Sequence, residues 1–194
     1  MVQTMFDPSV LAPETIRRLS RREYDHLVAL GVFEDERIEL LRGLLVTMSP
    51  QGGPHATITA WLVQRLGIAL GMDYDVRGHS PYAAGDDSEP EPDVSVSLRS
   101  AGVLEHPSTS LLVIEVAESS IRKDREVKST IYAEAGVGEY WIVDLSGSQL
   151  AVEVHTQPTS RGYRRIEILR DGDVLRPTQL PAIAVPVADI PWNR

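Results

Sequence analysis

Two acidic residues lie where this sequence predicts buried β-structure. Glu115 is part of the apolar run VIEVA at 113–117, and Asp93 opens the alternating run DVSVSL at 93–98. A carboxylate in such a strand is costly unless it is paired, hydrogen-bonded, protonated or bound to a metal. If the strands are neighbours, the two carboxylates repel each other unless a cation lies between them, and hard oxygen ligands suit Mg²⁺ or Mn²⁺. The pair therefore predicts a divalent-metal site, whereas either residue alone could be a strand-start residue or a satisfied core carboxylate.

The rarity of lysine in this sequence indicates a third candidate site residue. The chain contains two lysines, Lys123 and Lys128, beside seventeen arginines. A general preference for arginine codons explains such a composition. Lysine is, however, a compact point charge and arginine a planar fork, so a retained lysine indicates a role that arginine cannot fill.

Lys128 falls on a helix predicted over 122–135. Asp124 and Lys128 are four residues apart, which is the favourable order for an ion pair on a helix surface. The predicted buried stripe of this helix consists of Val127, Ile131 and Ala135. Lys128 lies about 100° around the helix from that stripe, so its long side chain could reach the strand end where Glu115 points.

The elements that position these residues form a pattern of strands around two helices. Ser20 and Glu23 predict a capping box for a helix that runs to about Leu30, and a turn at 42–43 joins hairpin strands at 38–41 and 44–48. A second helix is expected over 55–70, with one apolar face made of Ile58, Trp61, Leu62, Leu66, Ala69 and Leu70. Further strands are expected at 74–79, 93–98, 111–116, 139–144, 150–156 and 163–169. This order predicts a mixed sheet flanked by helices.

Length and composition indicate one domain over residues 1–194, with residues 1–19 as a loose N-terminal arm. The chain is 42% hydrophobic and 24% charged, which is ordinary for a soluble globular protein. It has no cysteine, no apolar run long enough to span a membrane and no signal-peptide pattern. We therefore expect a cytoplasmic protein without a membrane partner.

The net charge of −9 bears on nucleic-acid binding. A protein that grips DNA over a broad face carries a basic patch, so the acidic balance counts against tight, non-specific binding by a monomer. It leaves open a local basic groove, or one that a dimer assembles.

Several segments resemble a known family. PEPDVSV, LLVIEVAESS and RKDREVKSTIYAEAGVGEYWIVD are similar to the Uma2 family (the DUF820 group) of the PD-(D/E)XK nuclease superfamily, as are RIELLRGLLVTMSP and GGPHATITAWLVQRL. The resemblance covers roughly Ser20 to Asp144, with a weaker match at PVADI. It implies an α/β fold leaning towards α+β, with a restriction-endonuclease-like mixed sheet flanked by helices.

By position, the resemblance assigns the core of a site. Asp93 matches the aspartate of the motif and Glu115 its acidic ligand, with the carbonyl of Val116 as a further metal ligand. The usual lysine position, two residues after the glutamate, is Ala117 in this sequence. The resemblance implies that the lysine has moved to the following helix, where Lys128 is its match.

Other residues match the family with open alternatives. Glu39 and His55 resemble pocket residues of the family, although Glu39 could pair with Arg37 or Arg42 and His55 could only begin a helix. An acidic residue common after the hairpin glycine is replaced by Leu44 here. The matching aromatic residues are more typical of a core than of catalysis: Tyr132, Tyr140 and Trp141.

The predicted function is a Mg²⁺- or Mn²⁺-dependent endonuclease that hydrolyses phosphodiester bonds of nucleic acid, with DNA implied by resemblance. A homodimer is expected, because two sites cut two strands most simply. Two alternatives stay open: a catalytically silent binding or regulatory domain on the nuclease scaffold, and a sugar or nucleotide hydrolase that uses the paired carboxylates.

Overall fold

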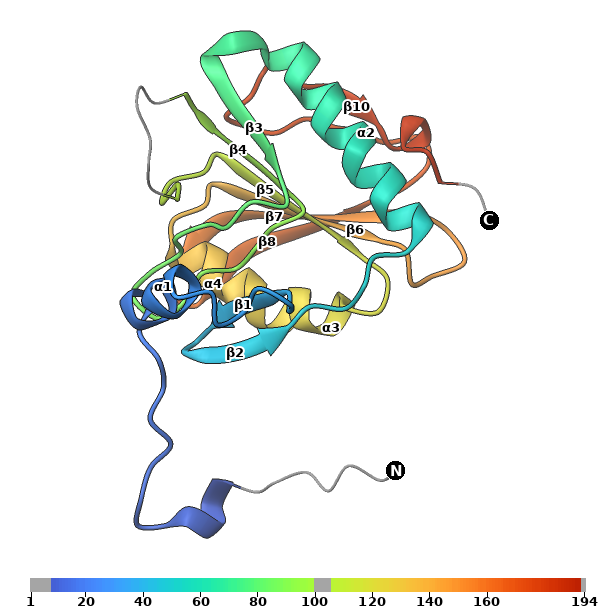
Figure 1. The fold of residues 1–194 in the computed structure, drawn as a ribbon. Coiled ribbons are helices and arrows are strands. Elements are labelled where there is room, and N and C mark those ends of the chain that lie inside the picture. Colours follow the sequence, from blue (N-terminus) through green and yellow to red (C-terminus); the bar gives the residue numbers. More distant parts are fainter. Residues whose placement is uncertain (1–7, 100–105, 193–194) are drawn as a thin grey trace.

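A six-stranded mixed sheet forms the centre of the protein. The computed structural model describes residues 8–99 and 106–192, and Figure 1 shows the chain as a ribbon. The strand order is β3-β4-β5-β6-β7-β8, with β5 and β6 parallel and every other neighbouring pair antiparallel. The strands are β3 (Tyr74–Gly78), β4 (Val94–Leu98), β5 (Leu112–Ala117), β6 (Glu139–Asp144), β7 (Ala151–Thr159) and β8 (Gly162–Leu169). The predicted strands are confirmed with small shifts at their ends.

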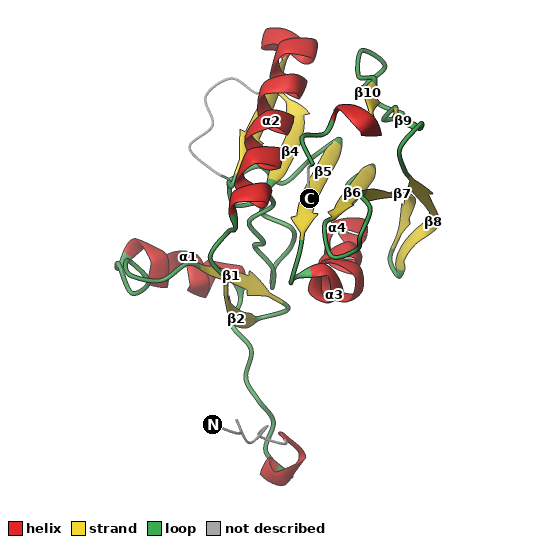
Figure 2. Cartoon of the chain, turned by 90° about the vertical axis from the view of Figure 1, so that its right-hand side faces the viewer, coloured by secondary structure: helices red, strands yellow, loops and turns green. Residues whose placement is uncertain are grey.

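Helices cover both faces of this sheet. Helix α2 (Gly53–Leu70) packs on one face together with the C-terminal segment, which contains β9 (Val174–Leu175), β10 (Val185–Pro186) and the 3₁₀ turn η4 (Val187–Asp189). The opposite face is covered by a composite helix that is built from α3 (Ile121–Lys123), η3 (Asp124–Lys128) and α4 (Ser129–Glu134). Figure 2 shows α2 and the composite helix on opposite sides of the sheet. The predicted mixed sheet flanked by helices is confirmed.

The alternation of side chains in β5 separates the two cores. All six residues of β5 are buried. Ile114 and Val116 belong to the core under α2, whereas Val113 and Ala117 belong to the core under the composite helix. Because side chains alternate along a strand, Glu115 points to the composite-helix face.

A separate hairpin lies beside the composite helix (Figure 1). It consists of β1 (Ile38–Leu41) and β2 (Leu44–Thr47), joined by Arg42 and Gly43, both with positive φ. A side chain at Gly43 would overlap Arg18, so this turn requires glycine. The hairpin is linked to the rest of the fold by a two-way backbone bridge between Leu40 and Glu89.

The N-terminal part of the domain begins with a capped helix. Helix α1 (Arg21–Ala29) has the capping box of Ser20 and Glu23 that the sequence predicts. The segment before it contains the 3₁₀ turn η1 (Pro8–Leu11) and leads away from the domain in Figure 1. Residues 1–7 of the expected arm lie outside the described residues. None of the helices in the described part of the chain combines the length and apolar character that a membrane crossing needs.

The composite helix differs from the prediction in its middle turn. Its segment η3 is π-helical, with hydrogen bonds from residue i to i+5. The wider turn rotates the buried face, so that Lys128 and Tyr132 are buried beside Ile131. The expected stripe residues Val127 and Ala135 are only partly buried. In α2, the predicted core residue Ala69 is exposed and Trp61 is partly buried, because the helix buries a narrower face.

Replacement of Leu62 by alanine should test the packing of α2. Leu62 is fully buried against the sheet, whereas Ile68 on the same helix is 75% exposed. We expect Leu62→Ala to lower the free energy of unfolding by about 2–5 kcal/mol, and Ile68→Ala to change it by less than about 0.5 kcal/mol. Urea denaturation of the two variants measures both values, and equal losses would contradict the assigned burial.

Candidate active site

Asp93 and Glu115 come together because β4 and β5 are neighbours. The antiparallel register pairs Val94 with Ile114, and continuing it by one residue sets Asp93 opposite Glu115. Residues directly opposite in such a pair have side chains on the same face. Both carboxylates are nearly buried, and both line one polar pocket with a volume of about 100 Å³.

Asp93 is held by three hydrogen-bonding groups. The backbone N–H of Val116 donates to Oδ2 at 2.8 Å, and His55 Nε2 lies 3.1 Å from the same oxygen. His79 Nδ1 lies 3.4 Å from Oδ1. Burial opposes ionisation of Asp93, but the contacts from His55, His79 and Val116 outweigh it and lower the pKa of this carboxyl below its ordinary value. Asp93 is therefore an anion at neutral pH.

Glu115 is compensated by protein groups. Lys128 Nζ donates to Oε1 at 2.9 Å and the Tyr132 hydroxyl donates to the same oxygen at 2.7 Å. Among the described residues, no hydrogen bond is made to Oε2. Burial raises the pKa of Glu115 well above its ordinary value, and the positive charge of Lys128 offsets only part of this effect. A lysine and a tyrosine therefore pair with this carboxylate, which is one of the alternatives that the sequence left open beside a metal ion.

Lys128 connects two acidic residues at the centre of the site. Its Nζ lies 2.9 Å from Glu115 Oε1 and 2.9 Å from Glu39 Oε2, and its side chain is 3% exposed. Burial favours a neutral lysine, but the carboxylates of Glu115, Glu39 and Asp124 raise the pKa of Lys128 above its ordinary value. Lys128 therefore carries a positive charge inside the protein. The interpretation of Asp124 and Lys128 as a surface ion pair is wrong, because both are buried.

Glu39 enters the site from the hairpin strand β1. Its two oxygens contact Lys123 Nζ at 2.6 Å and Lys128 Nζ at 2.9 Å, so both lysines of the chain meet at this carboxylate. Burial opposes ionisation of Glu39, yet the two lysines lower its pKa below the ordinary value. The alternative pairing with Arg37 or Arg42 is wrong, because Arg37 pairs with Glu91 and Arg42 with Glu134.

His55 lies in the first turn of α2 and does more than begin the helix. Its Nε2 contacts Asp93, and its ring lies beside that of His79 with centroids 6.2 Å apart. The other ring nitrogen, Nδ1, is buried and has no hydrogen-bond partner among the described residues. His55 lines the polar pocket, so its imidazole ring lies beside the carboxylates.

Sequence reasoning missed several members of this network. Asp124 lines the pocket, accepts a 2.6 Å hydrogen bond from the Ser120 hydroxyl and has a pKa that burial raises. His79 and Lys123 were not assigned to the site either. The i, i+4 spacing to Lys128 was a usable signal for Asp124, whereas the contacts of His79 and Lys123 join residues far apart in the chain.

The remaining matched positions belong to the cores. Ala117, at the usual lysine position, is fully buried and leaves no room for a longer side chain without rearrangement. Tyr140 and Trp141 are fully buried on opposite faces of the sheet, as expected of core residues. Leu44 is 45% exposed on the hairpin and supplies no carboxylate.

The donor set has the chemistry that a small divalent cation requires. Asp93 is ionised, Glu115 has an oxygen without a protein donor, and Val116 lies in the pocket wall. Within residues 8–99 and 106–192, no group of three or more His, Asp or Glu side chains is arranged to hold a metal. Two carboxylates with water as the remaining ligand is a common arrangement for Mg²⁺, so these residues fit such an ion without a three-side-chain cluster.

Comparison with known proteins identifies the family. The sequence profile of the Uma2 family, described as "putative restriction endonuclease", matches residues 21–188. No curated protein shows significant similarity to the sequence. Among solved structures, the chain is similar to a "putative nuclease belonging to DUF820" from Anabaena variabilis ATCC 29413, with a TM-score of 0.71 and 14% sequence identity over 89% of this chain and 97% of that chain. At this identity the similarity shows a shared fold, while the profile match spans most of the sequence. This chain belongs to the Uma2 family.

Proposed function

We propose that this protein is a metal-dependent endonuclease that hydrolyses phosphodiester bonds of DNA. The observation that carries the proposal is the convergence of Asp93, Glu115 and the buried ammonium of Lys128 on one polar pocket. The family description and the fold of a structural relative support nuclease chemistry. Two copies would bring one pocket to each strand of a duplex, and the expected homodimer stays a prediction.

Asp93, Glu115 and the carbonyl of Val116 would hold Mg²⁺ or Mn²⁺. A bound ion of this kind polarises a phosphate and lowers the pKa of an attacking water. The protein prepares the ligands in advance: hydrogen bonds keep Asp93 ionised, and Lys128 and Tyr132 fix the orientation of Glu115 through Oε1. Pre-positioned ligands need no rearrangement when the substrate arrives.

Lys128 and His55 supply the remaining chemistry. The positive charge of Lys128 stabilises negative charge that builds on the phosphate oxygens during attack. His55 is oriented by Asp93 through Nε2 and lies in the pocket wall, where it would act as a further ligand or as a proton shuttle. Burial of these groups strengthens each electrostatic interaction relative to water.

Neutralising either carboxylate should abolish cleavage. We expect Asp93→Asn and Glu115→Gln to lower the rate of plasmid cleavage in Mg²⁺ or Mn²⁺ by at least about 10²–10³-fold, and EDTA to stop the wild-type reaction. Glu153→Gln is the matched control, because Glu153 is also a buried strand glutamate held by hydrogen bonds but does not line the pocket. Unchanged cleavage by Glu115→Gln, measured by gel electrophoresis, would remove Glu115 from the reaction.

Loss of Lys128 should affect stability as well as activity. Lys128→Met leaves Glu39 and Glu115 buried without their shared cation, and we expect it to lower the free energy of unfolding by about 3–5 kcal/mol. Lys123→Met removes the more exposed lysine and should lower the free energy of unfolding much less.

Denaturation of Lys128→Met at several pH values tests whether the buried carboxylates cause the loss of stability. Burial raises the folded-state pKa of Glu115 above its unfolded value. The protonated carboxyl therefore supports the folded state at low pH, and this stability is lost as Glu115 ionises at higher pH. The deficit of Lys128→Met should therefore shrink from about pH 8 to about pH 5, and a pH-independent deficit would contradict this assignment.

One observation favours a second candidate, a catalytically silent binding or regulatory domain. Lys128 and Tyr132 compensate Glu115 with protein groups alone, so the carboxylate pair is stable as a purely structural network. Calorimetric titration with Mn²⁺ separates the two candidates. The nuclease binds Mn²⁺ and loses this binding in Asp93→Asn, whereas a silent domain releases no binding heat that depends on Asp93.

A further inference from the structure

A second depression adjoins the pocket. It has a volume of about 490 Å³ and shares Ser49, Ser119, Ser120 and Lys123 with the carboxylate pocket. The two hollows therefore lie side by side, between the hairpin strand β2 and the start of the composite helix. If the scissile phosphate of a nucleic-acid strand occupies the first hollow, the neighbouring phosphate of that strand must lie on an adjoining surface.

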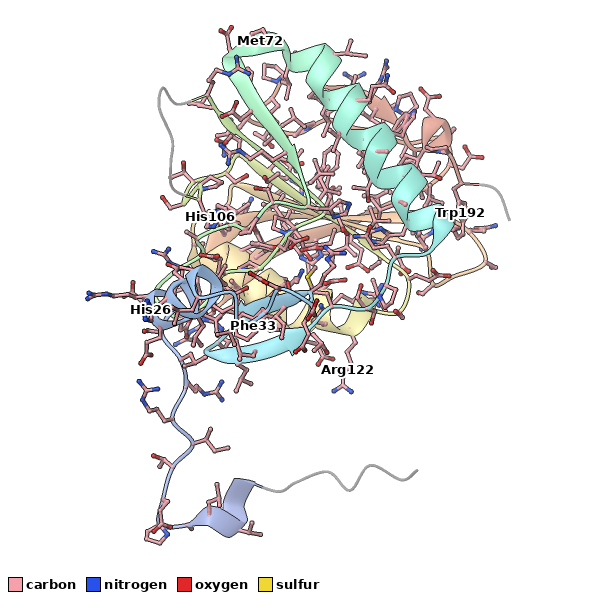
Figure 3. All side chains as sticks on the ribbon, viewed as in Figure 1. His26, Phe33, Met72, His106, Arg122 and Trp192 are labelled. Carbon is pink, nitrogen blue, oxygen red and sulfur yellow. The ribbon has the colours of Figure 1, made fainter. Side chains whose placement is uncertain are left out.

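The walls of this depression suit a phosphate. Four hydroxyl-bearing residues line it, Thr47, Ser49, Ser119 and Ser120, together with Val46, Val127 and Glu126. Arg122 lies on the outer side, and arginine presents a planar set of N–H donors that matches phosphate oxygens. Figure 3 shows the Arg122 side chain extending from the ribbon into solvent.

The ion pair between Arg122 and Glu126 is weak, so Arg122 can exchange this partner for another anion. Arg122 Nε lies 3.1 Å from Glu126 Oε2, but the two side chains are 85% and 60% exposed. Such exposed pairs contribute little free energy and are screened by salt. Lys123 and Lys128, in contrast, are held by the buried carboxylate of Glu39. Among the described residues that line either hollow, Arg122 is the cation with no buried partner.

The charge of the protein makes this cation important. The chain carries a net charge of −9, and the first hollow already contains Asp93, Glu115 and Asp124. A polyanion therefore needs positive charge next to the pocket for its flanking phosphates.

We propose that the depression around Arg122 is a subsite for the backbone phosphate that flanks the scissile one. The proposal rests on the nuclease function proposed above, and it names the part of the substrate that this surface binds. Arg122 contacts the phosphate directly, with the hydroxyl of Ser119 as a further donor, because the Ser120 hydroxyl already donates to Asp124. Glu126 competes with the phosphate for Arg122.

Binding of a labelled DNA duplex to the full chain tests the subsite. The measurement is fluorescence anisotropy with EDTA present, over a range of NaCl concentrations. We expect Arg122→Gln to raise Kd about eightfold at about 0.1 M salt, and to reduce the slope of log K against log salt by about 0.9, because that is the contribution of one phosphate contact. Glu126→Gln should lower Kd, since it releases Arg122.

Two controls separate a local contact from an effect of overall charge. Arg165→Gln changes another exposed arginine that is paired with a glutamate, Glu167 at 2.6 Å, but this arginine lies on strand β8 and lines neither hollow. It should leave Kd unchanged. The double variant Arg122→Gln/Glu126→Gln keeps the net charge of the protein, yet it should bind as weakly as Arg122→Gln. Addition of inorganic phosphate at a concentration similar to that of DNA should not compete, which distinguishes a strand phosphate from free phosphate.

The outcomes distinguish the subsite from the nuclease function. If wild-type protein cleaves DNA while Arg122→Gln and Arg165→Gln bind equally well, the subsite is wrong and the function stands. If no cleavage is found but Arg122→Gln still weakens binding, the nuclease function fails and the phosphate site stands. Absence of DNA binding by wild-type protein would overturn the subsite.

Discussion

The buried ammonium of Lys128 is the interaction on which the site depends. It contacts two carboxylates that come from different parts of the fold, Glu115 in β5 and Glu39 in β1. Moving such charges out of water carries a large desolvation cost, which is offset only when the geometry is good and the remaining polar atoms are satisfied. The Tyr132 hydroxyl and Lys123 complete that requirement by donating to Glu115 and Glu39.

This network also holds the hairpin to the rest of the protein. The hairpin of β1 and β2 is not part of the six-stranded sheet, and its backbone is joined to the rest of the chain by the bridge between Leu40 and Glu89 and by hydrogen bonds of the turn residue Gly43 with Asp87 and Leu19. Glu39 follows directly before Leu40 in the chain and forms ion pairs with two lysines of the composite helix. The same charges that shape the pocket therefore attach one of its walls, so structure and chemistry at this site cannot be separated cleanly.

Much of the fold follows from local patterns in the sequence. The capping box at Ser20 and Glu23, the hairpin turn at Arg42 and Gly43, and the apolar strand around Glu115 each depend on residues close together in the chain. The neighbourhood of Asp93 and Glu115 was also expected, because Asp93 stands at the start of one predicted strand and Glu115 lies within the next.

The partners of the site residues depend on contacts that no local pattern contains. Lys123 and Glu39 are 84 residues apart, and His55 and Asp93 are 38 residues apart. The segment DREVK has ordinary helix-forming residues, so its π-helical turn is set by packing rather than by propensity. That turn explains why the predicted stripe of Val127 and Ala135 was displaced and why Lys128 is deeper than expected.

The π-helical turn makes the site sensitive to chain length at one point. Such a turn holds one residue more than an ordinary α-helical turn, so removal of a single residue from 124–128 would restore regular geometry. Everything that follows would then rotate by about 100° relative to α3. Insertions and deletions in most surface loops shift nothing in the interior, but in this helix the deletion of one residue would turn Lys128, or the residues packed behind it, out of alignment. Lys128 can reach both Glu39 and Glu115 from this helix only while the extra residue is kept.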